Sequence, residues 1–258
     1  MLGIVQGLTE FLPVSSSGHL ILVRWAFGWD AGALGTPFDV ACHLGTLAAV
    51  VWFFRSDLLA MLMAAPDALG RRQTQEGRRI WLVAAATIPI VTAGLTLREW
   101  FESFRDPHVV AYTLVVGAGL LFLVERLRGR TGTEATLSVP GAFLIGCAQV
   151  CALVPGVSRS GATITAGMLL GMSRIASARF AFVMSVPAIG GAGAMEAMKL
   201  RHMTLNATDW QFFAVGFLTS AIVGYLTVSF LLRFLVGHRL DIFAWYRLLV
   251  AAALFLAL

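Results

Sequence analysis

The stretch EFLPVSSSGHL, residues 10–20, decides the fold of this chain. It places a carboxylate, a proline, three serines and a histidine inside an otherwise apolar segment. The chain around it has 258 residues, of which 58% are hydrophobic and 13% charged, with a mean hydropathy of +0.81. Such a composition excludes an ordinary soluble domain and predicts an integral membrane protein. Because polar groups are costly at membrane depth, these residues are functional candidates.

Six apolar runs have the length of membrane-spanning helices, because a helix needs about 20 residues to cross a hydrocarbon core about 30 Å thick. The runs are Phe38–Phe54, Ile80–Leu97, Val109–Val124, Ala176–Met198, Trp210–Phe234 and Phe243–Leu258. They are too long and continuous for the strands of a membrane barrel, so we predict an all-α polytopic membrane protein. The net charge of +5 resides mostly in the connections, which indicates topology signals; no nucleic-acid partner is expected.

A second copy of the polar stretch lies in the other half of the chain. When residues 3–21 are aligned without gaps to residues 146–164, seven of the nineteen positions are identical. The identities gather on the pattern Val-Ser-x-Ser-Gly, which is rare in lipid-spanning sequence. We therefore predict a single membrane domain, residues 1–258, built from an internal repeat, with repeat one at about 1–130 and repeat two at about 138–258.

Three apolar runs follow each copy, and because three is an odd number the second repeat should be inverted in the membrane. Arginines predict the orientation, since connections rich in Lys and Arg stay in the cytoplasm. If residues 140–172 dip into the membrane and return to the same face, most arginines share one side. They are Arg55, Arg71, Arg72, Arg78, Arg79, Arg126, Arg128, Arg130, Arg174, Arg179, Arg233, Arg239 and Arg247, with Lys199 and Arg201 as exceptions on the other side.

Each copy of the motif is predicted to form a re-entrant helical hairpin. Residues 1–12 would make a helix of about 18 Å, roughly half a bilayer, which Pro13 ends. Pro140–Val154 and Pro155 repeat this design. Irregular backbone survives at membrane depth only where protein or water covers it, so the two polar tips should meet near the middle of the bilayer.

After each proline a second half-helix is expected to begin at a serine, Ser15 or Ser158. Serine is a good N-cap, and two helix N-termini aimed at one point create an anion site. Arg159 adds a guanidinium fork suited to phosphate oxygens. We therefore predict that the tips bind a phosphate-bearing ligand, with Ser15, Ser17, Ser158, Arg159 and Ser160 as the contacts.

The first tip also carries the groups that phosphoryl transfer requires. Gln6 and Glu10 share a helical face at spacing i, i+4. Glu10 is either a general base or a ligand for a divalent cation, with Gln6 as a neutral oxygen ligand. His19 is expected to move protons, and either Ser16 or an activated water attacks phosphorus. Two alternatives stay open: Glu10 and Arg159 form a structural ion pair, or the serines only pack helices.

Other residues and another function are weaker interpretations. Asp39, His43 and Thr46 either line the same cavity or hydrogen-bond between helices. A secondary transporter for a phosphate or a lipid-linked phosphate would also use inverted repeats and an anion clamp. Transport, however, does not need a base such as Glu10 beside His19.

Two stretches resemble the signature motifs of the bacterial undecaprenyl-diphosphate phosphatases, the bacitracin-resistance proteins. GIVQGLTEFLPVSSSGHL, residues 3–20, is similar to the first motif, and PGVSRSGAT, residues 155–163, is similar to the second. The resemblance continues through residues 38–50 and 177–189 and covers essentially the whole chain. The acid-phosphatase-like lipid phosphatases match less well, because the histidine of their serine-arginine motif is missing after Arg159.

The resemblance implies an inner-membrane enzyme that hydrolyses undecaprenyl diphosphate to undecaprenyl phosphate and inorganic phosphate. This reaction recycles the lipid carrier of peptidoglycan synthesis and confers bacitracin resistance. The resemblance also implies an active site open to the periplasm, a divalent cation (Mg²⁺ or Ca²⁺), and frequently a homodimer.

The resemblance assigns roles to individual residues of the two motifs. Gln6 and Glu10 fall on the first motif, and Ser16 and His19 take its catalytic serine and histidine places. The second motif falls on Pro155, Gly156, Ser158, Arg159, Ser160 and Thr163, with Arg159 holding phosphate and Thr163 among its neighbours in that role. Gln6 stands where some members carry glutamate, which removes one carboxylate from any metal site.

Overall fold

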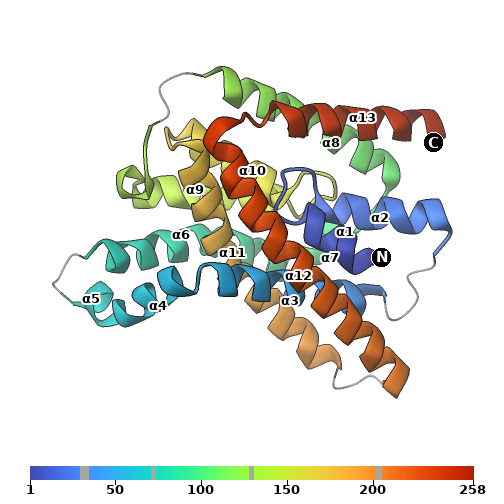
Figure 1. Ribbon diagram of the computed structural model, residues 1–258, viewed down its shortest axis with the longest axis horizontal. Coiled ribbons are helices and arrows are strands. Elements are labelled where there is room, and N and C mark those ends of the chain that lie inside the picture. Colours follow the sequence, from blue (N-terminus) through green and yellow to red (C-terminus); the bar gives the residue numbers. More distant parts are fainter. Residues whose placement is uncertain (30–34, 71–73, 128–130, 201–204) are drawn as a thin grey trace.

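The structure, a computed structural model, describes residues 1–29, 35–70, 74–127, 131–200 and 205–258, which fold into a bundle of helices (Figure 1). The helices are α1 (Leu2–Thr9), α2 (Ser16–Phe27), α3 (Gly35–Phe53), α4 (Arg55–Met63), α5 (Ala65–Leu69), α6 (Gln75–Thr96), α7 (Arg98–Glu102), α8 (Pro107–Arg126), α9 (Val139–Cys151), α10 (Arg159–Leu169), α11 (Arg174–Leu200), α12 (Ala207–Gly237) and α13 (Asp241–Ala257). A short 3-10 helix, Glu134–Thr136, lies between α8 and α9.

The six predicted apolar runs coincide, to within a residue, with parts of α3, α6, α8, α11, α12 and α13. Four of these helices, α6, α8, α11 and α12, are each long and apolar enough to cross a membrane. From Pro37 on, α3 passes the same test together with α4, from which it is bent by 73°. The 17 residues of α13 pack along α8. The chain is therefore an all-helical, multi-pass membrane protein.

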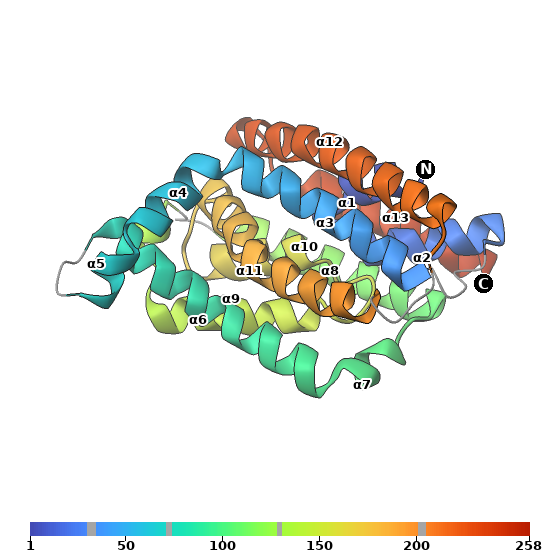
Figure 2. The same cartoon turned by 90° about the horizontal axis from the view of Figure 1, so that it is seen from below.

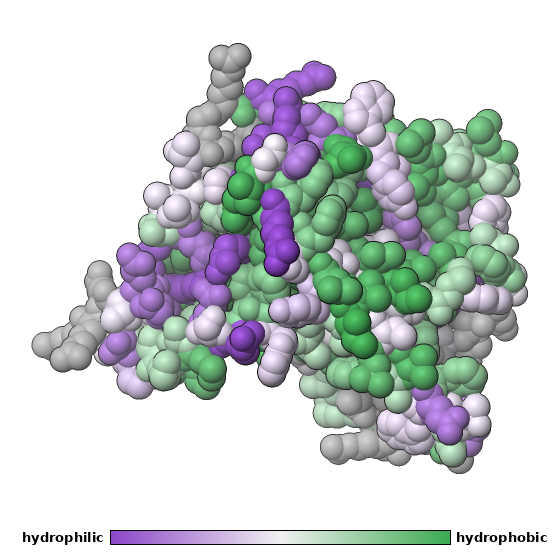
Figure 3. Space-filling view, in the orientation of Figure 1, coloured by the Kyte–Doolittle hydropathy of each residue, from purple (hydrophilic) through white to green (hydrophobic). Residues whose placement is uncertain are grey.

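Charged connections meet at one end of the molecule, where α3 joins α4, α5 precedes α6, and α8 precedes α9. We call it the arginine-rich end; α4 and α5 mark it at the left of Figures 1 and 2. Asp57 pairs there with Arg79 at 2.9 Å and with Arg179 at 3.1 Å, and Arg79 also reaches Glu134 at 2.6 Å. Figure 3 shows hydrophilic side chains gathered over this end and hydrophobic ones over the middle of the same face.

Several arginines that were predicted to share one side do lie at the arginine-rich end. Those with partners there are Arg78, Arg79, Arg174, Arg179 and Arg239. Arg247 does not belong to this group, because it is buried among the hairpin tips described below. The positions of Arg71, Arg72, Arg128, Arg130 and Arg201 lie outside the described residues.

The hairpin of α9 and α10 begins and ends at the arginine-rich end. Gly132, which precedes it, donates its N–H to Gly171 O at 3.0 Å and accepts from Ser173 N at 2.8 Å. Arg78 also donates to Leu137 O, just before α9. The segment between residues 132 and 173 therefore leaves this end of the molecule, turns, and comes back to it.

The first half-helix of each hairpin is shorter than predicted. Helix α1 ends at Thr9 rather than at residue 12, and α9 ends at Cys151 rather than at residue 154. Each end lies four residues before a proline, Pro13 or Pro155. Proline has no N–H for the carbonyl four residues earlier, and its ring clashes with that carbonyl, so the last helical turn cannot form.

Glycines let each first half-helix pack closely on a long helix. A Cβ on Gly3 of α1 would lie 2.9 Å from the carbonyl oxygen of Gly216 in α12. Its repeat counterpart, Gly146 of α9, is pressed against the carbonyl oxygen of Ala86 in α6. Because neither position has room for a side chain, α1 lies directly on α12 and α9 directly on α6.

Candidate active site

The two hairpin tips adopt the same backbone conformation. Ser15 and Ser158 have φ of 76° and 73°, and among the described residues they are the only non-glycine residues with positive φ. Ser15 Oγ accepts from Gly18 N at 3.3 Å, and Ser158 Oγ accepts from Gly161 N at 3.1 Å. The predicted N-caps are confirmed. Strained backbone of this kind concentrates at functional sites, and here it occurs at matching positions of both motifs.

The tips also contact one another, as predicted. Gly156 of the second tip donates its N–H to Ser15 Oγ at 3.1 Å. Ser160 donates its hydroxyl to the carbonyl oxygen of Leu12 at 2.9 Å. These hydrogen bonds join segments that are far apart in the sequence and fix the two helix N-termini beside each other.

A buried arginine of α13 holds this junction together. Arg247 is 1% exposed, so it is not a topology signal as predicted. Its guanidinium donates to five carbonyl oxygens, those of Pro13 (3.3 Å), Gly156 (2.8 Å), Val157 (3.1 Å), Thr113 (3.1 Å) and Leu114 (3.2 Å). These carbonyls belong to both tips and to α8, and one side chain satisfies them together.

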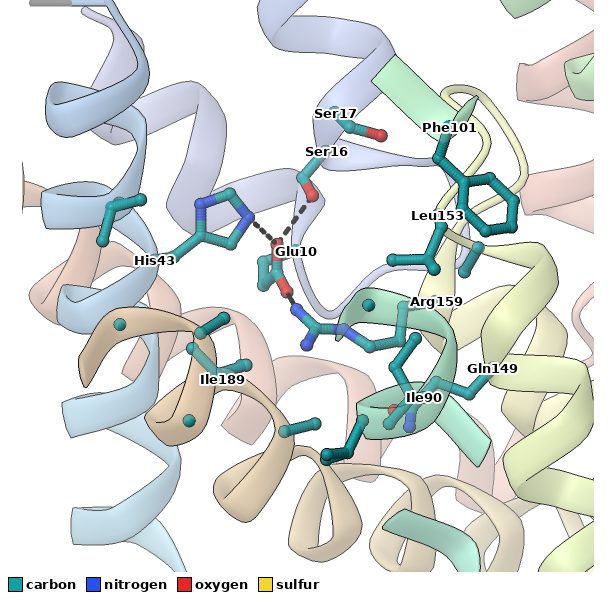
Figure 4. A pocket seen from close by; sticks show the side chains of 18 of the residues that line it. Glu10, Ser16, Ser17, His43, Ile90, Phe101, Gln149, Leu153, Arg159 and Ile189 are labelled. Carbon is teal, nitrogen blue, oxygen red and sulfur yellow. Dashed lines mark hydrogen bonds and ion pairs between the residues drawn. The ribbon is translucent and has the colours of Figure 1, made fainter. Parts of the chain in front are cut away.

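Glu10 lies at the centre of the site and is 6% exposed. Its Oε2 accepts a hydrogen bond from Ser16 Oγ at 2.6 Å and another from Gln6 Nε2 at 2.7 Å. Its Oε1 pairs with the guanidinium of Arg159. His43 Nε2 lies 3.6 Å from Oε2 (Figure 4). Four side chains from both hairpins and from α3 thus converge on one carboxylate.

These side chains line a cavity of about 560 Å³. Its polar residues include Glu10, Ser15, Ser16, Ser17, His43, Ser158 and Arg159. Its apolar walls come largely from α6 and α11, with Ile90, Val91, Leu95, Ile189 and Met195. Phe101 of α7 and Arg105, which follows α7, line it as well, and α7 lies away from the arginine-rich end (Figure 2). A cavity with one charged, serine-rich side and hydrocarbon walls suits an amphiphile with an anionic head.

Some predicted site residues do not line this cavity. His19 Nδ1 lies 2.7 Å from the carbonyl oxygen of Ser15, and its Nε2 lies 2.8 Å from the hydroxyl of Tyr246 in α13. Thr163 donates its hydroxyl to the carbonyl oxygen of Arg159 at 2.8 Å, within α10. The Ser160 hydroxyl donates to the carbonyl oxygen of Leu12, as described. The contacts of His19 with Tyr246 and of Ser160 with Leu12 join different segments, whereas that of Thr163 stays inside its own helix. The predicted chemical roles of His19, Ser160 and Thr163 stay predictions.

His43, a weaker candidate in the sequence, is the histidine that lies next to Glu10. Asp39 and Thr46, the other weak candidates of that segment, serve elsewhere: Asp39 pairs with Arg24 at 2.7 Å, and Thr46 donates to the carbonyl oxygen of His43 at 2.8 Å. His43 Nδ1 lies 2.7 Å from the carbonyl oxygen of Asp39, which can only accept. In the neutral ring Nδ1 therefore carries the proton and Nε2 presents a lone pair toward Glu10.

The donor atoms suit a cation that is held mainly by a ligand. Among the described residues that line the cavity Glu10 is the only carboxylate, and the described part of the chain has no group of three or more His, Cys, Asp and Glu side chains arranged for a metal. Gln6 Oε1 is buried without a hydrogen-bond partner in the described residues. Gln6 does not line the cavity, so its Oε1 is a buried oxygen beside Glu10 and not an open ligand. So sparse a donor set matches Mg²⁺, which commonly keeps several waters and binds substrate phosphates.

Comparison with known proteins agrees with this site. The family model described as bacitracin resistance protein BacA matches residues 1–253. A protein of Rubrobacter xylanophilus named undecaprenyl-diphosphatase is 49% identical over 98% of this chain and 94% of its own length. Undecaprenyl-diphosphatase 2 of Stutzerimonas stutzeri is 45% identical over 98% of this chain and 95% of its own length. The chain therefore belongs to the bacitracin resistance protein family.

Proposed function

We propose that the protein hydrolyses undecaprenyl diphosphate to undecaprenyl phosphate and inorganic phosphate, which recycles the carrier lipid and confers bacitracin resistance. The observation that carries this proposal is the 2.6 Å hydrogen bond from Ser16 Oγ to Glu10 Oε2, beside Arg159, in a cavity with apolar walls. The names of the relatives support it. A transporter would need the arginine clamp, but a carboxylate hydrogen-bonded to a hydroxyl serves to activate a nucleophile.

In the first step Ser16 Oγ attacks the terminal phosphorus of the substrate. The hydroxyl proton passes to Glu10 Oε2, which already accepts the hydrogen bond. The bond between this phosphorus and the bridging oxygen breaks, and undecaprenyl phosphate leaves with the electron pair. The terminal phosphoryl group then resides on Ser16.

In the second step water removes the phosphoryl group from Ser16. Glu10 first transfers its proton to His43 Nε2, whose lone pair faces it at 3.6 Å, and His43 releases that proton to water in the cavity. Glu10 then accepts a proton from the attacking water and returns it to the departing Ser16 Oγ. Inorganic phosphate leaves, and each turnover consumes one water and releases one proton.

Arg159 is proposed to hold the terminal phosphate during both steps. Its guanidinium pairs with Glu10 and lines the cavity, so it can bind phosphate oxygens while staying close to the carboxylate. Ser15, Ser17 and Ser158 line the same side and are the proposed neutral contacts. A divalent cation, Mg²⁺ or Ca²⁺, with Glu10 as its protein ligand, would neutralise charge on the phosphate oxygens.

The proposed topology is an inverted repeat with two re-entrant hairpins in the bacterial inner membrane. Three observations support it: the matching φ of Ser15 and Ser158, the packing of α1 on α12 and of α9 on α6, and the return of the second hairpin to the arginine-rich end. The arginine-rich end would face the cytoplasm. The cavity would then open to the periplasm, because Phe101 and Arg105 belong to the opposite end.

Cysteine labelling tests this orientation. In a chain whose three native cysteines are replaced, Ser103→Cys is exposed beside α7, and Leu69→Cys is exposed at the arginine-rich end. In intact cells an impermeant maleimide should label Ser103→Cys and spare Leu69→Cys until the membrane is opened. The reverse pattern would overturn the orientation.

We also propose a homodimer, which light scattering of the detergent-solubilised protein would detect as twice the chain mass.

Phosphate release tests the activity itself. Purified protein in detergent with Mg²⁺ should release inorganic phosphate from undecaprenyl diphosphate. Arg159→Ala should lower the rate of release by about 10²-fold or more. Release by Arg159→Ala at the wild-type rate would remove the proposed clamp from the mechanism.

A further inference from the structure

One buried side chain of the cavity has no part in the steps above. Gln149 of α9 is 0% exposed, and neither its Nε2 nor its Oε1 has a hydrogen-bond partner among the described residues. It lines the cavity together with Glu10 and Arg159, and Figure 4 shows its side chain reaching in from α9. Burying an amide without partners is costly, so this arrangement points to a ligand that completes its hydrogen bonds.

The repeat shows what Gln149 lacks. It aligns with Gln6 of the first motif, whose Nε2 donates to Glu10, four residues later on the same helical face, at 2.7 Å. Four residues after Gln149 comes Leu153, whose side chain has no polar atom to accept a hydrogen bond. The second motif therefore keeps the amide but not its partner within the hairpin.

The position of Gln149 indicates which part of the substrate it meets. In Figure 4, Ser16 and Gln149 lie on opposite sides of Arg159. In phosphoryl transfer the attacking and leaving oxygens lie roughly in line on either side of phosphorus. With Ser16 attacking a phosphate that Arg159 holds, the leaving phosphate, which is attached to the lipid, is expected on the side of Gln149.

We infer that Gln149 binds the lipid-side phosphate of the diphosphate. Its Nε2 donates a hydrogen bond to a non-bridging oxygen of that phosphate, and its Oε1 accepts one from a water molecule that hydrates the same group. Gln149 thus contributes to the preference for a diphosphate over a monophosphate and stabilises the leaving group. The inference rests on the proposed hydrolysis and assigns a separate subsite within it.

Isothermal titration calorimetry of the purified protein separates the two phosphate subsites without any turnover. The probes are farnesyl phosphate, which carries only the lipid-side phosphate, and inorganic phosphate, which mimics the terminal one. Gln149→Leu should raise the Kd of farnesyl phosphate about 10-fold to 100-fold, the value of one hydrogen bond to a charged group. The Kd of inorganic phosphate should stay within about twofold.

Stability and a matched control distinguish this role from a structural one. Gln149→Leu should unfold at the wild-type temperature or above it, because an apolar side chain replaces an unpartnered buried amide. Ser177→Ala is the control: Ser177 Oγ is also buried without a partner in the described chain, and it does not line the cavity, so both Kd values should be unchanged. If Gln149→Leu does not fold, Gln149→Asn is the second variant, because its side chain is one methylene shorter and its amide no longer reaches the phosphate. It should also raise the Kd of farnesyl phosphate.

The outcomes are separate from those for the proposed function. Unchanged farnesyl phosphate binding in Gln149→Leu, or a loss confined to inorganic phosphate, would overturn the inference while leaving hydrolysis intact. A wild-type protein that binds neither probe and releases no phosphate would instead overturn the proposed function.

Discussion

Ser16 and Glu10, six residues apart on the two arms of one hairpin, are joined by a hydrogen bond of 2.6 Å from Oγ to Oε2. Such a length is typical of a hydroxyl that donates to a carboxylate. The break at Pro13 makes the contact feasible, because it ends α1 and lets the chain turn so that α2 begins opposite Glu10. The proline therefore creates the pair of groups on which the proposed chemistry depends.

Replacing the serine tests whether it is the nucleophile. Ser16→Ala should lower kcat by about 10³-fold or more, because the attacking oxygen is lost while Arg159 still binds phosphate. Acid-quenched reactions with substrate labelled in its terminal phosphate should leave label on wild-type protein and none on Ser16→Ala. If Ser16→Ala retains more than a tenth of wild-type activity, the nucleophile is water and not Ser16.

Two histidines compete for the role of proton carrier, and their variants should behave differently. His43→Gln should lower kcat by about 10²-fold with an unchanged Tm, since it removes the proton acceptor beside Glu10. His19→Ala should lower activity and Tm together, because its ring connects α2 with Tyr246 of α13. Thermal unfolding and phosphate release measured on the same samples separate these cases. His108→Gln, at an exposed histidine, is the control.

A lowered kcat for His19→Ala at the wild-type Tm would restore the role that the sequence predicted for His19. A wild-type kcat for His43→Gln would exclude His43 from the proton path.

Removal of the buried arginine should loosen both tips at once. Arg247→Met leaves five carbonyl oxygens without their donor, which should cost about 3 kcal/mol or more and lower Tm by roughly 5–10 °C. Arg233→Met changes an exposed arginine of α12 and should leave Tm within about 1 °C. Equal Tm values for the two variants would contradict the role of Arg247 as the link between the hairpins.

Phosphate release should require a divalent cation, whereas the protein without substrate should bind that cation only weakly. A chelator should abolish phosphate release by wild-type protein, and added Mg²⁺ should restore it. Calorimetric titration of Mg²⁺ into the protein alone should give no Kd below about 1 mM, because the described residues of the cavity lining supply a single carboxylate. Micromolar affinity in the absence of phosphate would reveal a protein-built metal site that Glu10 and Gln6 alone do not explain.

The parts of this account that sequence could predict are those set by local signals. Six apolar runs, two prolines and two capping serines are read directly from residue types and spacing, and the helices follow them closely. The choice between His19 and His43 depends on how α2 packs against α13 and how α3 approaches Glu10. No local pattern contains that information.

Arg247 shows the same limit. In sequence it is one arginine among many, inside the last apolar run, and only the three-dimensional convergence of carbonyls from Pro13, Gly156 and α8 explains its burial. Gln149 did carry a sequence signal, its alignment with Gln6. That signal gains meaning only when the structure leaves its amide without a partner.

The most direct test of the central claim is phosphate release from undecaprenyl diphosphate by purified wild-type protein and by Glu10→Gln, with Mg²⁺ present. Glutamine keeps the size of the side chain but cannot take the proton of Ser16. We predict steady release by the wild type and a loss of about 10³-fold or more in the folded variant. Equal release by both proteins, or none by well-folded wild type, would contradict the account.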